Sequence, residues 1–207
     1  MSTEVIAVDS RSRAAQAEPV ARAAQELLGG GVIVIPTDTV YGIAQLASPN
    51  NSPDELKRIK ERPEEKNIPL LVGSLEDLEA CSVDLPNYAR QLAARHWPGA
   101  LTLVVKAAEK IPPAFRAADG SVGLRMPAHE FVLALIEAVG TPLVCSSANL
   151  SGAPAATSTD ELSLVIASRV SLIIDGGQCP GGVASTVLSC LGEEPQVLRP
   201  GPIAIQG

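Results

Sequence analysis

Aromatic side chains are scarce in this chain, at 2% of 207 residues. Hydrophobic residues nevertheless make up 46% of the sequence, so the core must be built mainly from Val, Ile, Leu and Ala. A chain of this length is expected to form one domain, and its hydrophobic content is ample for one continuous core. Internal repeats, low-complexity tracts and domain linkers are also absent from the sequence, which again favours a single domain.

Long apolar runs are missing too. None reaches the roughly 18 residues of a membrane-spanning helix, and residues 1–17 are polar, without the apolar segment of a signal peptide. We therefore expect a cytosolic protein. The four cysteines form no C-x-x-C pair, which favours free thiols in a reducing compartment over disulfides or a structural zinc site. They are Cys81, Cys145, Cys179 and Cys190.

The chain has no basic excess, because its formal net charge is −7 at pH 7. Proteins that bind duplex nucleic acid usually carry such an excess, since counterion release from the phosphates supplies most of their affinity. A small anionic ligand remains compatible with the acidic balance. Two unit charges about 4 Å apart at an effective dielectric near 20 interact by about 4 kcal/mol, whereas distant surface charges are screened within about 8–10 Å. Local arginines and lysines can therefore hold such a ligand.

A phosphate-binding loop of the G-x-x-x-x-G-K-[ST] type is absent as well. The glycine-rich segment 176–182 (GGQCPGG) is by itself a weak signal of phosphate binding. If the protein binds ATP, it does so without that motif.

Short apolar runs alternate with amphipathic segments along most of the chain, which predicts strands alternating with helices. The predicted helices cover residues 19–28, 52 to 63, a short segment from 74, about 87–96, 127–139, and 158 to about 169. The predicted strands cover residues 32–35, 68–72, 100–106, 122–125, 142–146, 172–175, 186–189 and 196–198. Because the last two strands are joined by a turn around Gly192, the sheet should be mixed in direction. The predicted fold class is α/β.

Residues 36–42 (PTDTVYG) follow the apolar run 32–35 directly. A β-branched run that stops at proline is typical of a buried strand, and α/β folds usually bind ligands beyond such strand ends. The segment places hydroxyls, a carboxylate and a small turn residue at this point. It therefore marks a candidate ligand site.

Basic residues gather near the end of the second predicted helix, which begins with a capping-box pattern at 52–55 (SPDE) and should continue to Pro63. They are Lys57, Arg58, Lys60, Arg62 and Lys66. One interpretation is a solvated helix face that forms ion pairs with neighbouring glutamates. The other is a phosphate site, in which lysine acts as a point charge and arginine as a bidentate fork.

Residues 146–152 (SSANLSG) also follow a predicted strand. Such a segment can be a structural turn, or its hydroxyls, amide and backbone donors can line a nucleotide site. A serine nucleophile is disfavoured, because Ser147 lies in no G-x-S-x-G motif and has no histidine nearby in the sequence. Arg125, at the end of a short apolar strand, is either a structural ion pair or an anion clamp. His96 and His129 are weak candidates for catalysis.

Five segments together resemble the YrdC family, the enzymes that make threonylcarbamoyl-adenylate for tRNA modification. They are residues 36–42, 60–63 (KERP), 123–127 (GLRMP), 146–152, and 185–187 (STV) with 198–201 (LRPG). The resemblance extends over about residues 20–203 in the order of the family. It implies a three-layer YrdC-like fold with a twisted mixed sheet, and residues 1–207 as a single catalytic domain, since members with an extra C-terminal domain are longer.

The resemblance implies an L-threonylcarbamoyladenylate synthase that uses L-threonine, bicarbonate or CO₂, and ATP. Mg²⁺ would accompany ATP, no protein metal site is expected, and the product would pass to a downstream threonylcarbamoyl transferase. Stable binding of nucleic acid or membrane is not expected. Two alternatives stay open: a double-stranded RNA-binding module without chemistry, and a domain that handles another carbamoyl-adenylate.

The family motifs also imply site residues. The expected catalytic residues are Lys60, Arg62, Ser147 and Asn149. The expected threonine-binding residues are Thr39, Arg125, Cys145 and Ser185. The expected ATP-binding residues are Lys60, Arg62, Lys66, Ser121, Ser147, Asn149, Ala155 and Arg199. Where many members carry a histidine after the strand near residue 70, this chain has Gly73.

Overall fold

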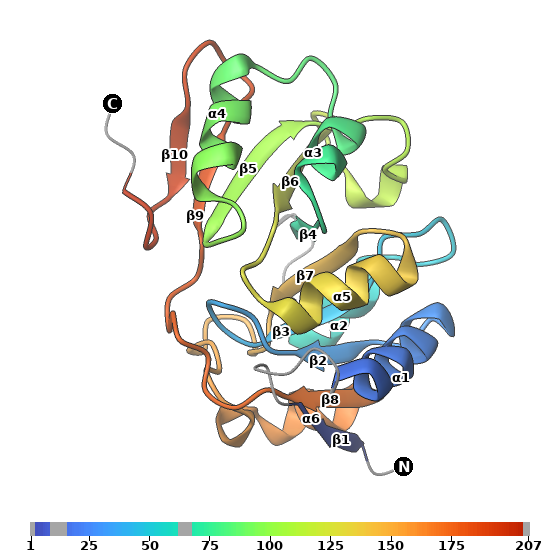
Figure 1. Ribbon diagram of the computed structural model, residues 1–207. Coiled ribbons are helices and arrows are strands. Elements are labelled where there is room, and N and C mark those ends of the chain that lie inside the picture. The colour runs from blue at the N-terminus through green and yellow to red at the C-terminus, as the bar shows by residue number, and fades with distance from the viewer. Residues whose placement is uncertain (1–2, 9–15, 62–67, 205–207) are drawn as a thin grey trace.

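A computed structural model of the chain describes residues 3–8, 16–61 and 68–204. Within these residues, ten strands form one sheet in the order β1-β8-β2-β3-β7-β4-β6-β5-β9-β10 (Figure 1). The strands are β1 (Glu4–Ala7), β2 (Ile33–Ile35), β3 (Gly42–Leu46), β4 (Leu70–Leu71), β5 (Leu101–Lys106), β6 (Ser121–Arg125), β7 (Leu143–Ser147), β8 (Leu172–Asp175), β9 (Thr186–Ser189) and β10 (Gln196–Arg199).

Neighbouring strands run in both directions. β8 lies parallel to β1 and β2, β4 is parallel to β6, and β5 is parallel to β9. β3 is antiparallel to both β2 and β7, and the pairs β4 and β7, β5 and β6, and β9 and β10 are also antiparallel. The predicted mixed sheet is therefore confirmed.

Helices cover both faces of the sheet. They are α1 (Ala17–Leu28), α2 (Asp54–Lys60), α3 (Leu75–Cys81), α4 (Asn87–His96), α5 (Glu130–Val139) and α6 (Leu164–Arg169), with short 3₁₀ helices at Pro113–Phe115 and Thr159–Glu161. Helices α1 and α5 lie side by side on one face (Figure 1). α2 contacts α6 and β3, and its buried apolar residues belong to the hydrophobic cluster on the other face of the sheet. α4 contacts β5.

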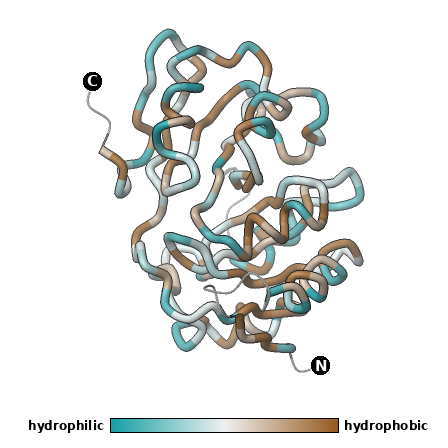
Figure 2. Tube along the Cα trace, in the orientation of Figure 1, coloured by the Kyte–Doolittle hydropathy of each residue, from teal (hydrophilic) through white to brown (hydrophobic). Residues whose placement is uncertain are grey.

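The core divides into two clusters because successive strand residues point to opposite faces. In β2, Ile33 and Ile35 pack in the cluster beneath α1 and α5, whereas Val34 belongs to the cluster on the other face. Phe131 is the aromatic residue of the first cluster, which otherwise consists of aliphatic residues and one cysteine. Figure 2 shows hydrophobic residues concentrated along the strands and α5, with more hydrophilic residues in the surface turns.

Two strands were missed from the sequence. β3 is buried along its whole length, but it reads GIAQL, with small and polar residues in place of a β-branched run. It forms because it lies between β2 and β7 and hydrogen-bonds to both. β1 is mostly exposed and is an edge strand, paired with β8 alone within the described sheet. In both cases the position in the sheet, and not the local composition, explains why the segment forms a strand.

Several predicted boundaries were wrong. The strand predicted over 68–72 is confined to β4. The capping box at 52–55 does not form: the Ser52 hydroxyl accepts a 3.2 Å hydrogen bond from the Asp54 amide, and the N-cap position is Pro53, with no side-chain cap. The helix predicted over 158 to 169 is a 3₁₀ turn followed by α6, which is capped by the hydroxyl of Ser163. The other predicted helices and strands agree with the structure to within a few residues.

In the described part of the chain, no helix combines the length and the apolar character needed to cross a membrane. No group of three or more His, Cys, Asp or Glu side chains there is arranged to hold a metal ion. The four cysteines are free and buried.

Candidate active site

A cavity of about 570 Å³ opens between the loop that precedes β3 and strands β5, β6, β7, β9 and β10. This volume is within the range of roughly 300–1,000 Å³ that is usual for ligand sites. Seven of the predicted site residues line it: Thr39, Ser121, Arg125, Cys145, Ser147, Ser185 and Arg199. The fold therefore brings together residues from most of the chain.

The loop between β2 and β3 is held by its own hydroxyls. The Thr37 side chain accepts hydrogen bonds from the amides of Thr39 (3.1 Å) and Val40 (3.2 Å) and donates one to the Val40 carbonyl oxygen (2.7 Å). The hydroxyls of Thr37 and Thr39 are 2.9 Å apart. Both side chains are buried. The two threonines of this segment thus fix the backbone of the turn and aim the Thr39 oxygen at the cavity.

Gly42 is required where this loop enters β3. A Cβ atom built at Gly42 would lie 2.4 Å from the Sγ atom of Cys145. Cys145 is itself buried, and burial raises the pKa of its thiol to about 12, although the charges of Arg125 and Lys60 partly oppose that effect. The thiol is therefore protonated at neutral pH and is not a nucleophile. Cys145 can contribute shape and main-chain groups to the cavity.

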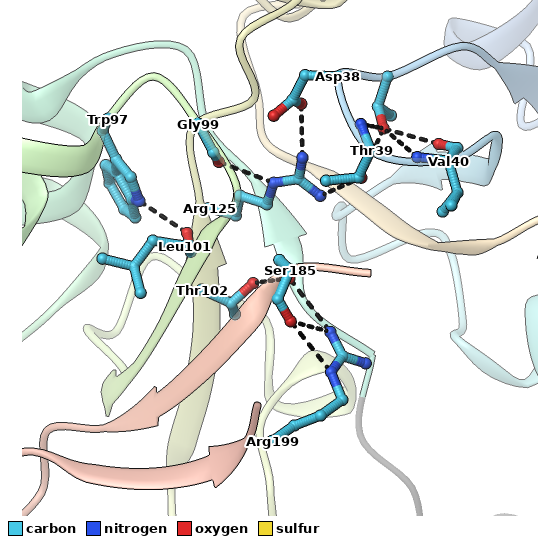
Figure 3. Close-up of polar contacts among 11 residues, drawn as sticks. Asp38, Thr39, Val40, Trp97, Gly99, Leu101, Thr102, Arg125, Ser185 and Arg199 are labelled. Atoms are coloured by element: carbon cyan, nitrogen blue, oxygen red, sulfur yellow. Dashed lines mark hydrogen bonds and ion pairs between the residues drawn. The ribbon is translucent and has the colours of Figure 1, made fainter. Parts of the chain in front are cut away.

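Arg125, the last residue of β6, is buried and makes three side-chain contacts (Figure 3). Its Nη2 atom forms a 2.5 Å ion pair with Asp38, its Nη1 atom donates to the Thr39 hydroxyl at 3.0 Å, and its Nε atom donates to the Gly99 carbonyl oxygen at 3.1 Å. The same guanidinium lines the cavity. Both sequence interpretations of Arg125 therefore remain physically compatible: it has a carboxylate partner and it faces a ligand space.

Ser185, Arg199 and Thr102 form a second polar group on the cavity wall (Figure 3). Arg199 donates to the Ser185 carbonyl oxygen from Nε (3.1 Å) and Nη2 (2.8 Å), and the hydroxyls of Thr102 and Ser185 are 2.8 Å apart. Burial lowers the pKa of Arg199, and the charge of Arg125 lowers it further. The two guanidinium groups thus act on each other across one cavity, which favours an anionic ligand there.

Lys60 is the last residue of α2 and is buried, with 2% of its surface exposed. Its ammonium group donates to the carbonyl oxygens of Ser147 and Asn149, the latter at 2.7 Å, and lies 3.2 Å from the Asn149 side-chain oxygen. The interpretation of Lys60 as part of a solvated helix face is therefore wrong. That interpretation does describe Arg58, which is exposed and pairs with Glu55.

The helix that carries Lys60 ends before Pro63 because Glu61 adopts a left-handed conformation, with φ of 52°. Arg169, from α6, donates to the Ile59 carbonyl oxygen at 3.0 Å and forms an ion pair with Glu61 at 3.0 Å. These bonds satisfy carbonyl groups at the helix end. Arg62 and Lys66 lie outside the described residues.

Asn149 and Ala155 belong to the loop that follows β7, but they are not part of the cavity lining as the structure describes it. The Asn149 amide group donates to the carbonyl oxygens of Leu150 (3.0 Å) and Ala153 (2.6 Å). Asn149 thus orders its own loop, and Lys60 ties that loop to α2. Gly73 faces a different region, since its amide donates to Asp77 and a Cβ atom there would lie 3.2 Å from Ile136.

Asp38 and Thr102 were not predicted as site residues, although the structure places both in the polar contacts of the site. Asp38 lies within the 36–42 motif, and this position could have identified it as a site residue. Thr102 has no such sequence signal, because it lies inside an apolar strand. His129 occupies the N-cap position of α5, but its side chain makes no capping hydrogen bond.

A sequence-family model described as "Telomere recombination", for Sua5, YciO and YrdC proteins, matches residues 25–201. The chain belongs to the Sua5/YciO/YrdC family. Among curated members of this family, a threonylcarbamoyl-AMP synthase from Pyrococcus abyssi is 37% identical over 86% of this chain. One from Bacillus subtilis is 37% identical over 89% of it.

A solved Sua5/YciO/YrdC structure has a similar fold. The crystal structure of Pyrococcus abyssi Sua5 complexed with L-threonine matches 96% of this chain with a TM-score of 0.87 and 35% identity. The present chain corresponds to 58% of that protein, and to 52% and 54% of the Pyrococcus and Bacillus synthases. It thus spans about half the length of the curated relatives it matches.

Proposed function

We propose that this chain is an L-threonylcarbamoyladenylate synthase, a nucleotidyltransferase. It would convert L-threonine, bicarbonate or CO₂, and ATP into threonylcarbamoyl-AMP and pyrophosphate for threonylcarbamoyladenosine modification of tRNA. The observation that carries the proposal is the cavity wall on which Arg125 and Arg199 face the same space. The naming of the relatives as threonylcarbamoyl-AMP synthases adds support.

The chemistry needs no protein nucleophile. The amine of threonine takes up CO₂ and loses a proton to give a carbamate. A carbamate oxygen then attacks the α-phosphorus of ATP, and pyrophosphate leaves. The demands on the protein are orientation of two substrates and compensation of charge on a polyphosphate. A cavity of arginine, serine and threonine side chains suits both demands.

The threonine subsite is proposed around Arg125. Its guanidinium would bind the carboxylate of threonine. The hydroxyls of Thr39 and Ser185 would lie beside the substrate, and Cys145 would form part of the cavity wall. Support comes from the relative whose structure holds L-threonine. A charge-assisted hydrogen bond from arginine is the strong, directional contact that a carboxylate requires.

The ATP subsite is proposed to use Lys60, Arg62, Lys66, Ser121, Ser147, Asn149, Ala155 and Arg199. Arg199 and Ser121 support this assignment because they line the cavity with side chains that can donate to phosphate or ribose oxygens. We propose that Lys60 acts here through the loop after β7: its charge holds the backbone of Ser147 and Asn149 in place. Lys60, Arg62, Ser147 and Asn149 are the proposed catalytic set.

Mg²⁺ is proposed to enter with ATP. Asp119, a carboxylate in the cavity lining, accepts a 3.0 Å hydrogen bond from the amide of Ser121, and hydrogen bonds from Ser121 lower the pKa of its carboxyl group. One carboxylate and several hydroxyls fit an ion that keeps its waters and is held mainly by phosphate oxygens. The ion would offset charge on those oxygens.

The product is proposed to pass to a downstream threonylcarbamoyl transferase in the cytoplasm, and residues 1–207 are proposed to act as a single catalytic domain. The two alternatives have less support. A double-stranded RNA-binding module is disfavoured by the net charge of −7. A domain that handles another carbamoyl-adenylate is disfavoured by the threonine-bound relative at 35% identity.

The decisive experiment measures pyrophosphate release from ATP in bicarbonate buffer, with and without L-threonine, together with mass spectrometry of the labile product. We expect release that depends on threonine, and a product with the mass of threonylcarbamoyl-AMP. Serine and allothreonine serve as matched substrates. Release that is indifferent to the amino acid would refute the proposal.

A further inference from the structure

The ion pair of Arg125 and Asp38 lies in a wall between two cavities. Arg125 lines the cavity of about 570 Å³. Asp38 lines a second cavity of about 280 Å³, together with His129, Gly177 and Cys179. The side chains of Arg125 and Asp38 are only 8% and 12% exposed. Asp38 therefore holds Arg125 from behind, on the side away from the proposed substrates.

The contacts of Arg125 leave a defined part of its guanidinium for a ligand. Of the five N–H bonds of an arginine side chain, three have partners in the described structure, on Asp38, Thr39 and Gly99. One N–H bond on each terminal nitrogen is left over, which is the number that a carboxylate needs for two hydrogen bonds. The orientation set by Asp38 thus determines where those two donors point.

Asp38 itself cannot shift easily. A Cβ atom at Gly181 would lie 2.6 Å from the Asp38 carbonyl oxygen and 3.0 Å from the Cα atom of Thr39. The amide of Gly182 also donates to the Thr39 carbonyl oxygen at 2.9 Å. The glycine-rich segment 176–182 therefore packs directly on the backbone of Asp38 and Thr39, and glycine permits that approach.

We propose that Asp38 is a positioning residue that sets the affinity for the amino-acid substrate. This inference rests on the proposed function, in which Arg125 binds the carboxylate of threonine. Asp38 has two opposing effects on that step. Its hydrogen bond fixes the guanidinium in a productive orientation, which favours binding. Its negative charge already neutralises Arg125 and repels a second carboxylate, which disfavours binding.

The two effects can be separated by substitution. Asp38→Asn keeps an oxygen that accepts the hydrogen bond from Nη2 but removes the charge, so binding of threonine should become tighter. Asp38→Ala removes both, so Arg125 loses its orientation and binding should become weaker. A purely structural ion pair predicts something different, because both substitutions would then harm the site in the same direction.

The test is calorimetric titration of L-threonine into the full chain and its variants, with ATP titrated in parallel and thermal unfolding recorded for each. We expect the dissociation constant for threonine to fall about tenfold in Asp38→Asn and to rise about tenfold in Asp38→Ala, with ATP affinity unchanged. Asp84→Asn, which breaks an exposed Asp84–Lys106 ion pair, is the matched control and should leave both affinities unchanged.

Two outcomes overturn the inference separately from the proposed function. If the unsubstituted chain binds threonine and Asp38→Asn binds it equally or more weakly, Asp38 does not compete with the substrate carboxylate, and only this inference fails. If the unsubstituted chain does not bind threonine at all, the proposed function fails with it. Should Asp38→Ala not fold, the direction of change in Asp38→Asn still decides.

Discussion

The ammonium group of Lys60 donates a 2.7 Å hydrogen bond to the main-chain oxygen of Asn149, 89 positions away in the sequence. The end of α2 and the loop after β7 are thereby joined by a buried charge. A buried ammonium group is stable only when its donors are satisfied, and the carbonyl oxygens of this loop supply the acceptors. Loss of this contact should therefore affect both the conformation of the loop after β7 and the stability of the fold.

Lys60→Ala should therefore lower both stability and turnover. The substitution removes the donor that Lys60 supplies to the Asn149 carbonyl oxygen, which costs about 1–3 kcal/mol of unfolding free energy. Turnover should fall by up to about 10²-fold, the cost of a misplacement of about 1 Å in a catalytic site, because the loop that carries Ser147 and Asn149 loses the contact that holds its backbone in place. Denaturant unfolding and pyrophosphate release measure the two effects.

Arg58→Ala is the matched control, since Arg58 is exposed on the same helix and should change stability by only about 0.5 kcal/mol. Equal behaviour of the two variants would contradict the structure.

Arg125→Ala should abolish use of threonine and leave nucleotide binding largely intact. A charge-assisted hydrogen bond to a carboxylate contributes about 1.5–3 kcal/mol, and alanine loses all of it. Calorimetry with threonine and with ATP distinguishes the two ligands. Arg90→Ala, which removes an exposed arginine paired with Glu79, should affect neither. Lost ATP affinity with unchanged threonine affinity would mean that the two subsites are exchanged.

Duplex RNA should bind only weakly. At physiological salt we expect a dissociation constant no better than about 10⁻⁴–10⁻⁶ M, the ordinary non-specific range, because the net charge is −7. A filter-binding or gel-shift assay with a 20-base-pair duplex gives the value. Nanomolar affinity would restore the RNA-binding module as a serious alternative.

His129 should make the protein less stable in mild acid. Its Nδ1 atom is buried and has no hydrogen-bond partner in the part of the chain described, and burial lowers its pKa below the ordinary value of 6.5. Between those two pKa values the unfolded chain binds more protons than the folded protein. Stability is therefore unaffected well above pH 6.5 and declines as the pH falls toward the folded pKa.

The pH effect can be measured as the unfolding midpoint at pH 7.5 and at pH 5. His129→Gln should lose less stability over this interval than the unsubstituted protein, because it removes the group that takes up the proton. His96→Gln, at the end of α4, serves as the control. An identical loss in all three proteins would exclude His129 as the cause.

Much of the fold was predictable because its elements carry local signals. Helices α4 and α5 and strand β5 have clear periodicity, and Gly140 ends α5 in a left-handed conformation that favours glycine. β3 was not predictable in this way. Its sequence is neither alternating nor β-branched, and it becomes a strand because two neighbours offer hydrogen-bond partners on both sides.

The sequence by itself determined which residue types stand at the ends of the strands, since hydroxyls, arginines and glycines were visible in the motifs of 36–42, 123–127 and 146–152. Only the tertiary structure decided which of them meet. The Arg125–Asp38 pair spans 87 positions, and Lys60 is buried because distant carbonyl oxygens accept its hydrogen bonds. The physical reason is that ion pairing and desolvation depend on distance in space, and a sequence pattern records only distance along the chain.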